Sequence, residues 1–159
     1  MRRKSRISYN MLDEVDRKIL EILQEDATIS LEEIGKRLKM SKTAIHYRIN
    51  RLKSRGIIKK IAAIVDPSSV GYDLLAVSLI KAKYAPGYQE IVGEKLSKIK
   101  GVWGVYFTLG DIDYIVLIRA KDRGDLQRIV NEFINIPEIE RSSTIVVLKR
   151  IKEDFKVEL

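Results

Sequence analysis

The first third of the chain repeats apolar residues every three or four positions, in three successive segments. This period predicts three helices, because residues so spaced share one helical face. The first helix is expected to begin after Asp13, and the second after Ser30, which has Glu33 at the spacing of a capping box. The third helix follows Ser41 and directs three aliphatic side chains inward: Ile45, Ile49 and Leu52.

After the third helix the apolar pattern changes and then stops. Residues 57–65 are rich in β-branched side chains and predict a strand or small wing. Asp66, Pro67 and the two serines that follow break the pattern, so a domain boundary is expected there. The predicted organisation is a basic arm over 1–10, a winged helix-turn-helix domain over 11–66, a linker over 67–73 and a second domain over 74–159.

Beyond the linker the pattern runs strand, helix, strand, strand, helix, strand. The expected strands are residues 74–84, 102–109, 114–120 and 143–150, and the expected helices are 88–99 and 123–134. This order predicts a ferredoxin-like βαββαβ sandwich, a four-stranded antiparallel sheet with two helices on one face, and hence an α+β protein. Apolar residues on the bare face of the sheet would be exposed to water, so we expect another subunit to cover it.

The distribution of charge indicates a partner for the first domain. The net charge is +8, with 30 Lys and Arg against 22 Asp and Glu. Residues 1–65 hold 16 of these cations and 8 of the acids, whereas residues 66–159 hold 14 of each. A basic helix-turn-helix indicates double-stranded DNA. High Lys, Glu and Ile usage is also typical of thermophilic proteins, so a generally charged surface is the other explanation.

Several kinds of chemistry lack the residues that they need. The chain has no cysteine and a single histidine, His46, which excludes thiolate zinc sites and leaves a histidine metal cluster without partners. We expect no metal, and for the function predicted below we expect no cofactor and no enzymatic activity. No apolar stretch follows the basic N-terminus, and no segment approaches the roughly 18 apolar residues of a membrane span, so we expect a cytoplasmic protein.

The third helix carries the candidate DNA-binding residues. Residues 41–55 include five basic residues and no acid, which suits a surface that approaches phosphates. The N-terminal part of such a helix enters the major groove, so the predicted base contacts are Lys42, Thr43, His46 and Tyr47, followed by Asn50, which could bind adenine. The predicted phosphate contacts are Arg48, Arg51, Lys53 and Arg55.

Other roles stay open for single residues of this helix. Arg48 could pair with an acid of the first helix instead of a phosphate. His46 could make no contact, and Tyr47 could fold over the neighbouring helix. Any one basic residue could simply be solvated, so the prediction depends on the group.

Motifs in both domains point to one family. The first helix carries Leu-Asp-x-x-Asp-x-x-Ile-Leu, the third carries Ser-x-x-x-Ile-x-x-Arg-Ile-x-x-Leu, and Gly-x-Ile follows. The residues concerned are Leu12, Asp13, Asp16, Ile19, Leu20, Ser41, Ile45, Arg48, Ile49, Leu52, Gly56 and Ile58. The second domain has Gly-x-x-Asp-Tyr from Gly110 and a last strand at 143–148. This combination resembles the leucine-responsive and asparagine-operon regulator (Lrp/AsnC) family, although many members carry threonine at the position of Leu109.

The resemblance implies an assembly and a ligand. Members of this family form dimers, and often tetramers or octamers, through the second domain, and many bind an amino acid between dimers. The implied effector pocket surrounds the turn of Gly110, Asp111 and Asp113, where backbone N–H groups could meet a carboxylate and a side chain an ammonium group. Asp122 and Thr144 are further candidates. Turn chemistry for the two aspartates of the turn and a helix cap for Asp122 stay open.

These expectations combine into one function with two alternatives. A dimer would present two recognition helices to successive major grooves, which predicts a sequence-specific transcription regulator acting on a palindromic site. An amino acid could then shift its occupancy of DNA. One alternative is an architectural DNA-binding protein of low specificity, since attraction to phosphates is independent of sequence. The other is an enzyme similar to sirohaem decarboxylases, which the position of the only histidine on the DNA helix disfavours.

Overall fold

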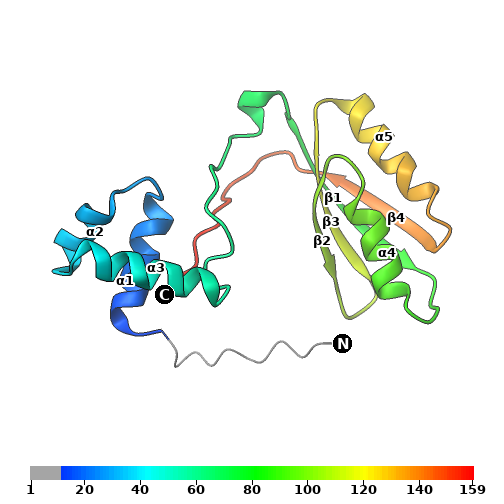
Figure 1. Cartoon of the computed structure of the whole chain (residues 1–159). Helices are drawn as coiled ribbons and strands as arrows, with labels where there is room; N and C mark the ends of the chain where they lie inside the picture. Colours follow the sequence, from blue (N-terminus) through cyan, green and yellow to red (C-terminus); the bar gives the residue numbers. More distant parts are fainter. Residues whose placement is uncertain (1–11) are drawn as a thin grey trace. The chain divides into compact units, whose positions relative to one another are not determined.

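A computed structural model describes residues 12–159 of the chain (Figure 1). The basic arm predicted over residues 1–10 lies outside this part. The chain divides into two compact units, one ending at Ala63 and the other formed by Ile64–Glu153. Asp154–Leu159, expected in the second domain, belong to the first unit instead, because they lie against its first helix.

The described residues of the first unit form three helices around a small core. They are α1 (Glu14–Glu25), α2 (Leu31–Leu38) and α3 (Lys42–Ser54). As predicted, each begins after a residue whose side chain accepts a backbone N–H of the first turn: Asp13, Ser30 and Ser41. The buried residues of the core are Ile19, Leu20, Ile34, Ile45, Ile49 and Leu52.

The turn between α2 and α3 is tight. Lys39 has a left-handed backbone, with φ of 54°, and the N–H of Met40 donates to the carbonyl of Gly35 at 2.8 Å. A Cβ atom on Gly35 would lie 2.6 Å from the carbonyl oxygen of Met40. Glycine at position 35 therefore lets the turn approach α2 this closely.

The strand or wing predicted over residues 57–65 is absent from the described structure, so this detail of the prediction is wrong. Ile57 and Ile58 turn back onto the helical core, and their N–H groups donate to the carbonyl of Leu52 at 3.0 and 3.2 Å. The residues that follow are exposed and have no neighbouring strand to pair with. A β-branched run becomes a strand only where a second edge can bind its backbone.

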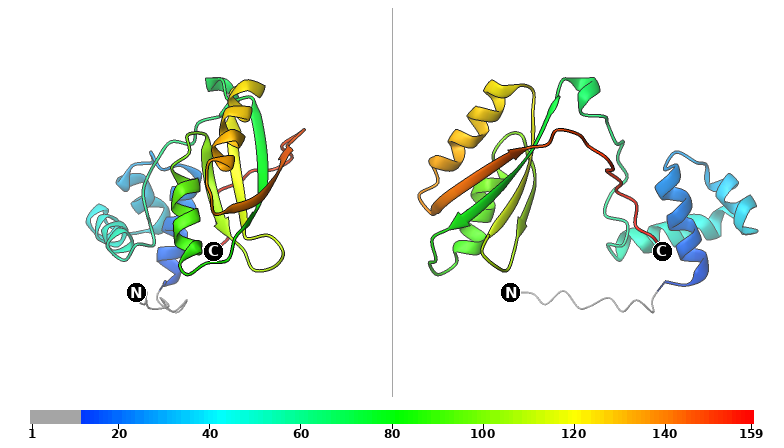
Figure 2. Two further views of the ribbon diagram at one scale, coloured as in Figure 1. Left: turned by 90° about the vertical axis from the view of Figure 1, so that its right-hand side faces the viewer. Right: turned by 180° about the vertical axis from the view of Figure 1, so that it is seen from behind.

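The second unit is the predicted ferredoxin-like sandwich. After a short 3-10 helix, η2 (Ser68–Val70), it contains β1 (Leu74–Ala82), α4 (Tyr88–Ser97), β2 (Val102–Phe107), β3 (Tyr114–Ala120), α5 (Arg123–Ile134) and β4 (Ile139–Val146). The sheet is antiparallel, in the order β2-β3-β1-β4. Both helices cover the same face of the sheet (Figure 2).

The last strand begins earlier than the predicted 143–150. Its pairing with β1 runs from Ala82 opposite Ile139 to Ala76 opposite Val146. Only two residues of β1 precede Ala76, so little edge remains for residues 147–150. The position of the partner strand, which periodicity cannot predict, fixes the ends of β4.

Alternate residues of the sheet face the helices. In β1 and β3 the inward side chains are buried against α4 and α5, with Val92, Leu96, Ile129 and Phe133 among the helix residues of this core. The opposite face has no covering element within the unit, and its half-buried or exposed apolar side chains include Val77, Leu79, Tyr106, Ile115, Leu117 and Ile145.

Candidate nucleic-acid interface

Helix α3 buries one face and exposes the other, as predicted. Ile45, Ile49 and Leu52 are between 0% and 6% exposed. The exposed residues of the opposite side are Lys42, Thr43, His46, Tyr47, Asn50, Lys53 and Arg55. Tyr47 is 67% exposed, so it does not fold over a neighbouring helix. Seven of the nine predicted DNA-contacting residues are therefore accessible on α3 or at its C-terminal end.

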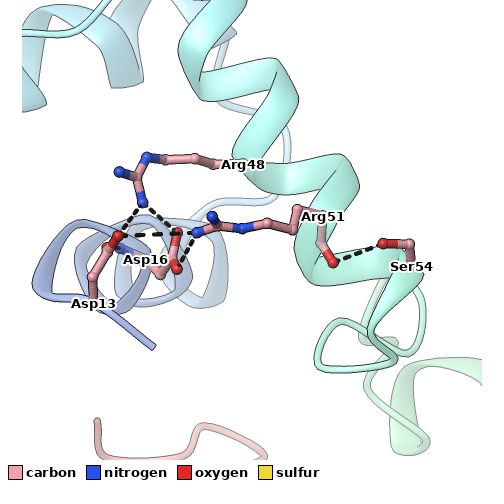
Figure 3. A network of polar contacts seen from close by, with 5 residues as sticks. All are labelled: Asp13, Asp16, Arg48, Arg51 and Ser54. Carbon is pink, nitrogen blue, oxygen red and sulfur yellow. Dashed lines mark hydrogen bonds and ion pairs between the residues drawn. The ribbon is translucent and has the colours of Figure 1, made fainter. Parts of the chain in front are cut away.

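The other two, Arg48 and Arg51, point at the beginning of α1 (Figure 3). Arg48 Nη1 lies 2.5 Å from Asp13 Oδ2 and 2.8 Å from Asp16 Oδ1. Arg51 Nη2 lies 2.6 Å from Asp16 Oδ2. The ion pair that the sequence left open for Arg48 is thus present, and Arg51 makes a second one.

Burial makes this network stronger than an ordinary surface ion pair. The side chain of Asp16 is 1% exposed, and each of its two carboxylate oxygens binds a different guanidinium. Asp13 is 49% exposed, and its other oxygen caps α1 by accepting the N–H of Asp16 at 2.8 Å. The hydrogen bond from Arg48 holds the pKa of Asp13 below its usual value, and the same bond raises the pKa of Arg48.

The exposed residues of α3 differ in how free they are. Lys42 pairs with Glu32 of α2 at 2.5 Å, but both side chains are more than half exposed. Asn50 Nδ2 lies 3.1 Å from His46 Nε2, one helical turn away. Lys53 and Arg55 have no ion pair within residues 12–159 and so remain available to an anion.

The predicted effector residues lie in three places. Gly110 and Asp111 belong to the exposed connection between β2 and β3, and Gly110 has a φ of 139°. Asp122 caps α5 beyond the other end of β3, accepting the N–H of Asp125 at 2.8 Å. Thr144 lies within β4, where its hydroxyl is 2.6 Å from that of Ser78. The structure brings only Gly110, Asp111 and Asp113 together.

Asp113 differs from its neighbours in the turn because it is buried, at 3% exposure. Its carboxylate accepts the N–H of Ala82 at 2.8 Å and the hydroxyl of Tyr88 at 3.4 Å, with Lys81 Nζ 3.7 Å away. Its own N–H donates to the carbonyl of Ile80. Asp113 therefore joins the start of β3 to the end of β1.

A row of aromatic rings lines this end of the sheet. Tyr84, Tyr88, Phe107 and Tyr114 make successive edge-to-face contacts, with ring centroids 5.4, 6.0 and 5.4 Å apart. Burial raises the pKa of Tyr114 to about 12, and its hydroxyl donates to the carbonyls of Tyr88 and Gln89. This end of the sheet thus combines an exposed acid, Asp111, and exposed backbone at Gly110 with a row of aromatic side chains.

Sequence reasoning missed two residues that shape the interface. Asp16 belongs to the sequence motif, but the motif does not reveal its partners, although Asp13 and Asp16 have the same i, i+3 spacing as Arg48 and Arg51. That matched spacing was the available signal for a cross-link between helices. Gly35 left no local signal, because its role depends on the path of the turn that follows α2.

Two negative findings apply to the described part of the chain. No helix there is long and apolar enough to cross a membrane. No group of three or more His, Asp or Glu side chains among residues 12–159 could hold a metal ion.

Comparison with known proteins gives matches over both units. Residues 12–53 match the AsnC-type helix-turn-helix domain, and residues 76–157 match the Lrp/AsnC ligand-binding domain. The HTH-type transcriptional regulator FL11 of Pyrococcus horikoshii is 42% identical over 142 residues, which cover 89% of this chain and 93% of the relative.

Solved structures agree with these matches. An AsnC family transcriptional regulator from Agrobacterium tumefaciens has a TM-score of 0.86 at 27% identity, over 92% of this chain and 97% of the other. A transcriptional regulator of Neisseria meningitidis in complex with L-methionine has a TM-score of 0.85 at 25% identity, over 92% and 96% of the two chains.

Proposed function

The chain belongs to the Lrp/AsnC family of transcriptional regulators, and on this basis we propose that α3 reads a specific DNA sequence. The protein is a transcriptional regulator with a helix-turn-helix domain. The observation that carries the proposal is the outer face of α3, which exposes cations and polar side chains and contains no acid. Relatives named as regulators make an enzyme the weaker alternative.

Within this surface the residues have different tasks. The N-terminal half offers Lys42, Thr43, His46 and Tyr47 to base edges, with Asn50 one turn further on. Lys53 and Arg55, which have no partner within the described chain, would hold phosphates. Base readers beside phosphate binders favour sequence-specific binding over architectural compaction, and the proposal places this regulator in the cytoplasm.

Selection from a pool of random duplexes, at stated salt, tests this proposal. A regulator should enrich a palindrome whose half-sites lie about one helical turn, or a multiple of it, apart. An architectural protein would enrich no sequence, because its affinity comes from phosphates. Tyr47→Ala should change which duplexes are enriched, since Tyr47 is exposed among the candidate base readers.

The proposal includes a homodimer formed through the uncovered face of the sheet. Six apolar side chains, distributed over all four strands, lie on that face, and their exposure to water is unfavourable. Leu117→Glu should therefore turn the dimer into a monomer in sedimentation velocity. A variant that stays dimeric would place the contact elsewhere. Sedimentation velocity of the wild-type protein also measures assembly beyond the dimer, to a tetramer or octamer.

We further propose that an amino acid binds at the turn of Gly110 and Asp111 and alters the affinity for DNA. The L-methionine complex of the Neisseria meningitidis regulator supports this class of ligand. Calorimetric titration with each of the twenty amino acids should give heat with at least one, which Asp111→Asn should reduce. Absence of heat with all twenty, together with unchanged assembly, would contradict the proposal.

A further inference from the structure

We infer that Arg48 and Arg51 are positioning residues that set the orientation of α3 on α1, and that they do not hold DNA phosphates. This inference rests on the proposed function, because it concerns how the recognition helix meets DNA. It also departs from what the sequence predicted, since a basic residue on such a helix is expected to bind phosphate.

Breaking the network of Asp16 with Arg48 and Arg51 would be unfavourable. Asp16 is almost wholly buried, and its two oxygens are satisfied by one guanidinium each, at 2.8 and 2.6 Å. If either arginine turned toward a phosphate, a buried carboxylate would lose half of its compensation. An uncompensated buried charge is strongly unfavourable, so the arginines stay with Asp16.

The two arginines are also poorly accessible to a phosphate. The side chains of Arg48 and Arg51 are 21% and 27% exposed, whereas Lys42 on the same helix is 60% exposed. The Nε atom of Arg51 is enclosed and has no hydrogen-bond acceptor. A bidentate phosphate contact needs two adjacent N–H groups directed at solvent. Arg51 cannot offer Nε for that purpose.

The charges of the network also cancel. Two carboxylates balance the two guanidiniums, so the network adds no net attraction for a polyanion. The phosphate contacts predicted on this helix then reduce to Lys53 and Arg55. Their contribution should appear in the salt dependence of binding, and that of the network should not.

The geometry explains what the network does instead. Asp13 and Asp16 occupy the beginning of α1, and Arg48 and Arg51 are one turn apart on α3, so the two helices are joined at matching intervals (Figure 3). Such a double link opposes rotation of α3 about its own axis. Rotation would move Thr43 and Tyr47 away from the bases that they read, since neighbouring residues on a helix differ by about 100°.

The experiment compares Arg48→Gln and Arg51→Gln with Lys53→Gln and Arg55→Gln, all in the full chain. Affinity for the selected duplex and for a random duplex is measured over a range of KCl concentrations. Each control variant should lower the slope of log affinity against log salt by about 0.9, the loss of one phosphate contact. The two arginine variants of the network should leave that slope unchanged. They should lower the ratio of specific to random affinity about tenfold, comparable to one lost base contact.

Asp13→Asn separates positioning from stability. Asparagine can still cap α1, and Asp13 is half exposed, so the core stays intact while the charge facing Arg48 is removed. Positioning predicts a lower specificity ratio in this variant, although thermal melting shows it folded. If Arg48 were a phosphate ligand restrained by Asp13, the same change would steepen the salt slope by about 0.9 and leave the ratio intact.

The possible failures can be told apart. If Arg51→Gln or Arg48→Gln lowers the slope as much as Lys53→Gln, the inference is wrong and the proposed function stands. If folded arginine variants keep the full specificity ratio, the positioning role is likewise excluded. If the wild-type chain binds no duplex, the proposed function fails first and the inference fails with it.

Discussion

In the described part of the chain each unit buries one acid, and the two acids are stabilised by different kinds of partner. Asp16 in the first unit is bound by arginines of another helix, more than thirty residues away in sequence. Asp113 in the second unit is bound mainly by a backbone N–H of the neighbouring strand. Charge therefore fixes the angle between two helices in one unit, whereas in the other a carboxylate completes a turn at the end of the sheet.

The two units also differ in the size of their apolar cores, which determines how much a buried ion pair contributes to the stability of each. Among residues 12–159, the first unit buries six apolar residues, and the second buries thirteen between its sheet and its helices. A small core leaves less apolar contact to hold each helix in place, so a buried ion pair weighs more in the total. We therefore expect substitutions in the acidic network to act strongly and locally.

Asp16→Ala should produce the largest loss of stability, and this loss should be confined to the first unit. Removing the acid leaves two arginines at a nearly closed site, which typically costs about 3–5 kcal/mol. The loss should appear in the far-UV circular dichroism melt of the helical unit. Trp103, the only tryptophan, lies in β2, so its fluorescence follows the second unit and should keep its transition. Equal shifts in both signals would show that the units do not unfold separately.

Alkaline pH should destabilise the second unit. The pKa of Tyr114 is raised to about 12, so its protonated form is favoured by folding. Stability from Tyr114 is complete below its ordinary pKa of about 10 and is lost as pH rises toward 12, by about 2–3 kcal/mol. Denaturant melts followed by Trp103 at pH 9 and pH 11.5 measure it. Tyr114→Phe should remove this part of the loss, which separates it from the deprotonation of lysines.

Acid should weaken the first unit. The pKa of Asp13 is lowered by its hydrogen bond from Arg48, so its stabilising effect is present above about pH 4 and lost as pH falls through the lower value of the folded state. The circular dichroism melt of Asp13→Asn should depend less on pH in this range than that of wild type. An unchanged dependence would assign the acid sensitivity to other carboxylates.

Local patterns predicted most of the fold, because helix caps and strand alternation depend on residues close in sequence. Ser30 and Ser41 cap the helices they were expected to cap, and α5 has its predicted bounds. The failures have a common cause, which is dependence on a distant partner. Residues 57–65 have strand composition but no edge to pair with, and β4 takes its ends from β1.

The candidate DNA-binding surface also has features that depend on nearby residues and features that depend on a distant partner. The outward face of α3 follows from the spacing of Ile45, Ile49 and Leu52, and periodicity predicts it. An arginine that periodicity places on the outer face can bind either a phosphate or an acid, and the choice depends on which helix packs next to it. The sequence allowed a phosphate or an acid as the partner of Arg48, and it predicted a phosphate for Arg51. The ion pairs of both arginines with Asp16 depend on tertiary packing.

Gly35→Ala should be less damaging than Asp16→Ala but should still disturb DNA binding. The added methyl group would lie 2.6 Å from a backbone oxygen, so the turn must move, at a cost of about 1–3 kcal/mol. Gly93→Ala in α4 is the matched control, because its methyl group meets nothing nearer than 3.7 Å. That variant should be neutral or more stable by up to about 1 kcal/mol, since alanine favours helices. Equal losses in the two variants would contradict the role of close approach at Gly35.

The smallest effect is expected where the end of the chain joins α1. The side-chain amide of Gln24 donates to the carbonyl of Val157 at 3.0 Å and accepts its N–H at 2.7 Å, beside an ion pair of Lys156 with Glu25. These contacts are exposed, so Gln24→Ala should cost the first unit less than about 1 kcal/mol. It should nevertheless speed hydrogen exchange at Val157, whose N–H loses its acceptor. Glu25→Gln removes the ion pair alone and should leave that exchange rate nearly unchanged. If Glu25→Gln speeds exchange as much, the ion pair and not the amide fastens the tail to the helix.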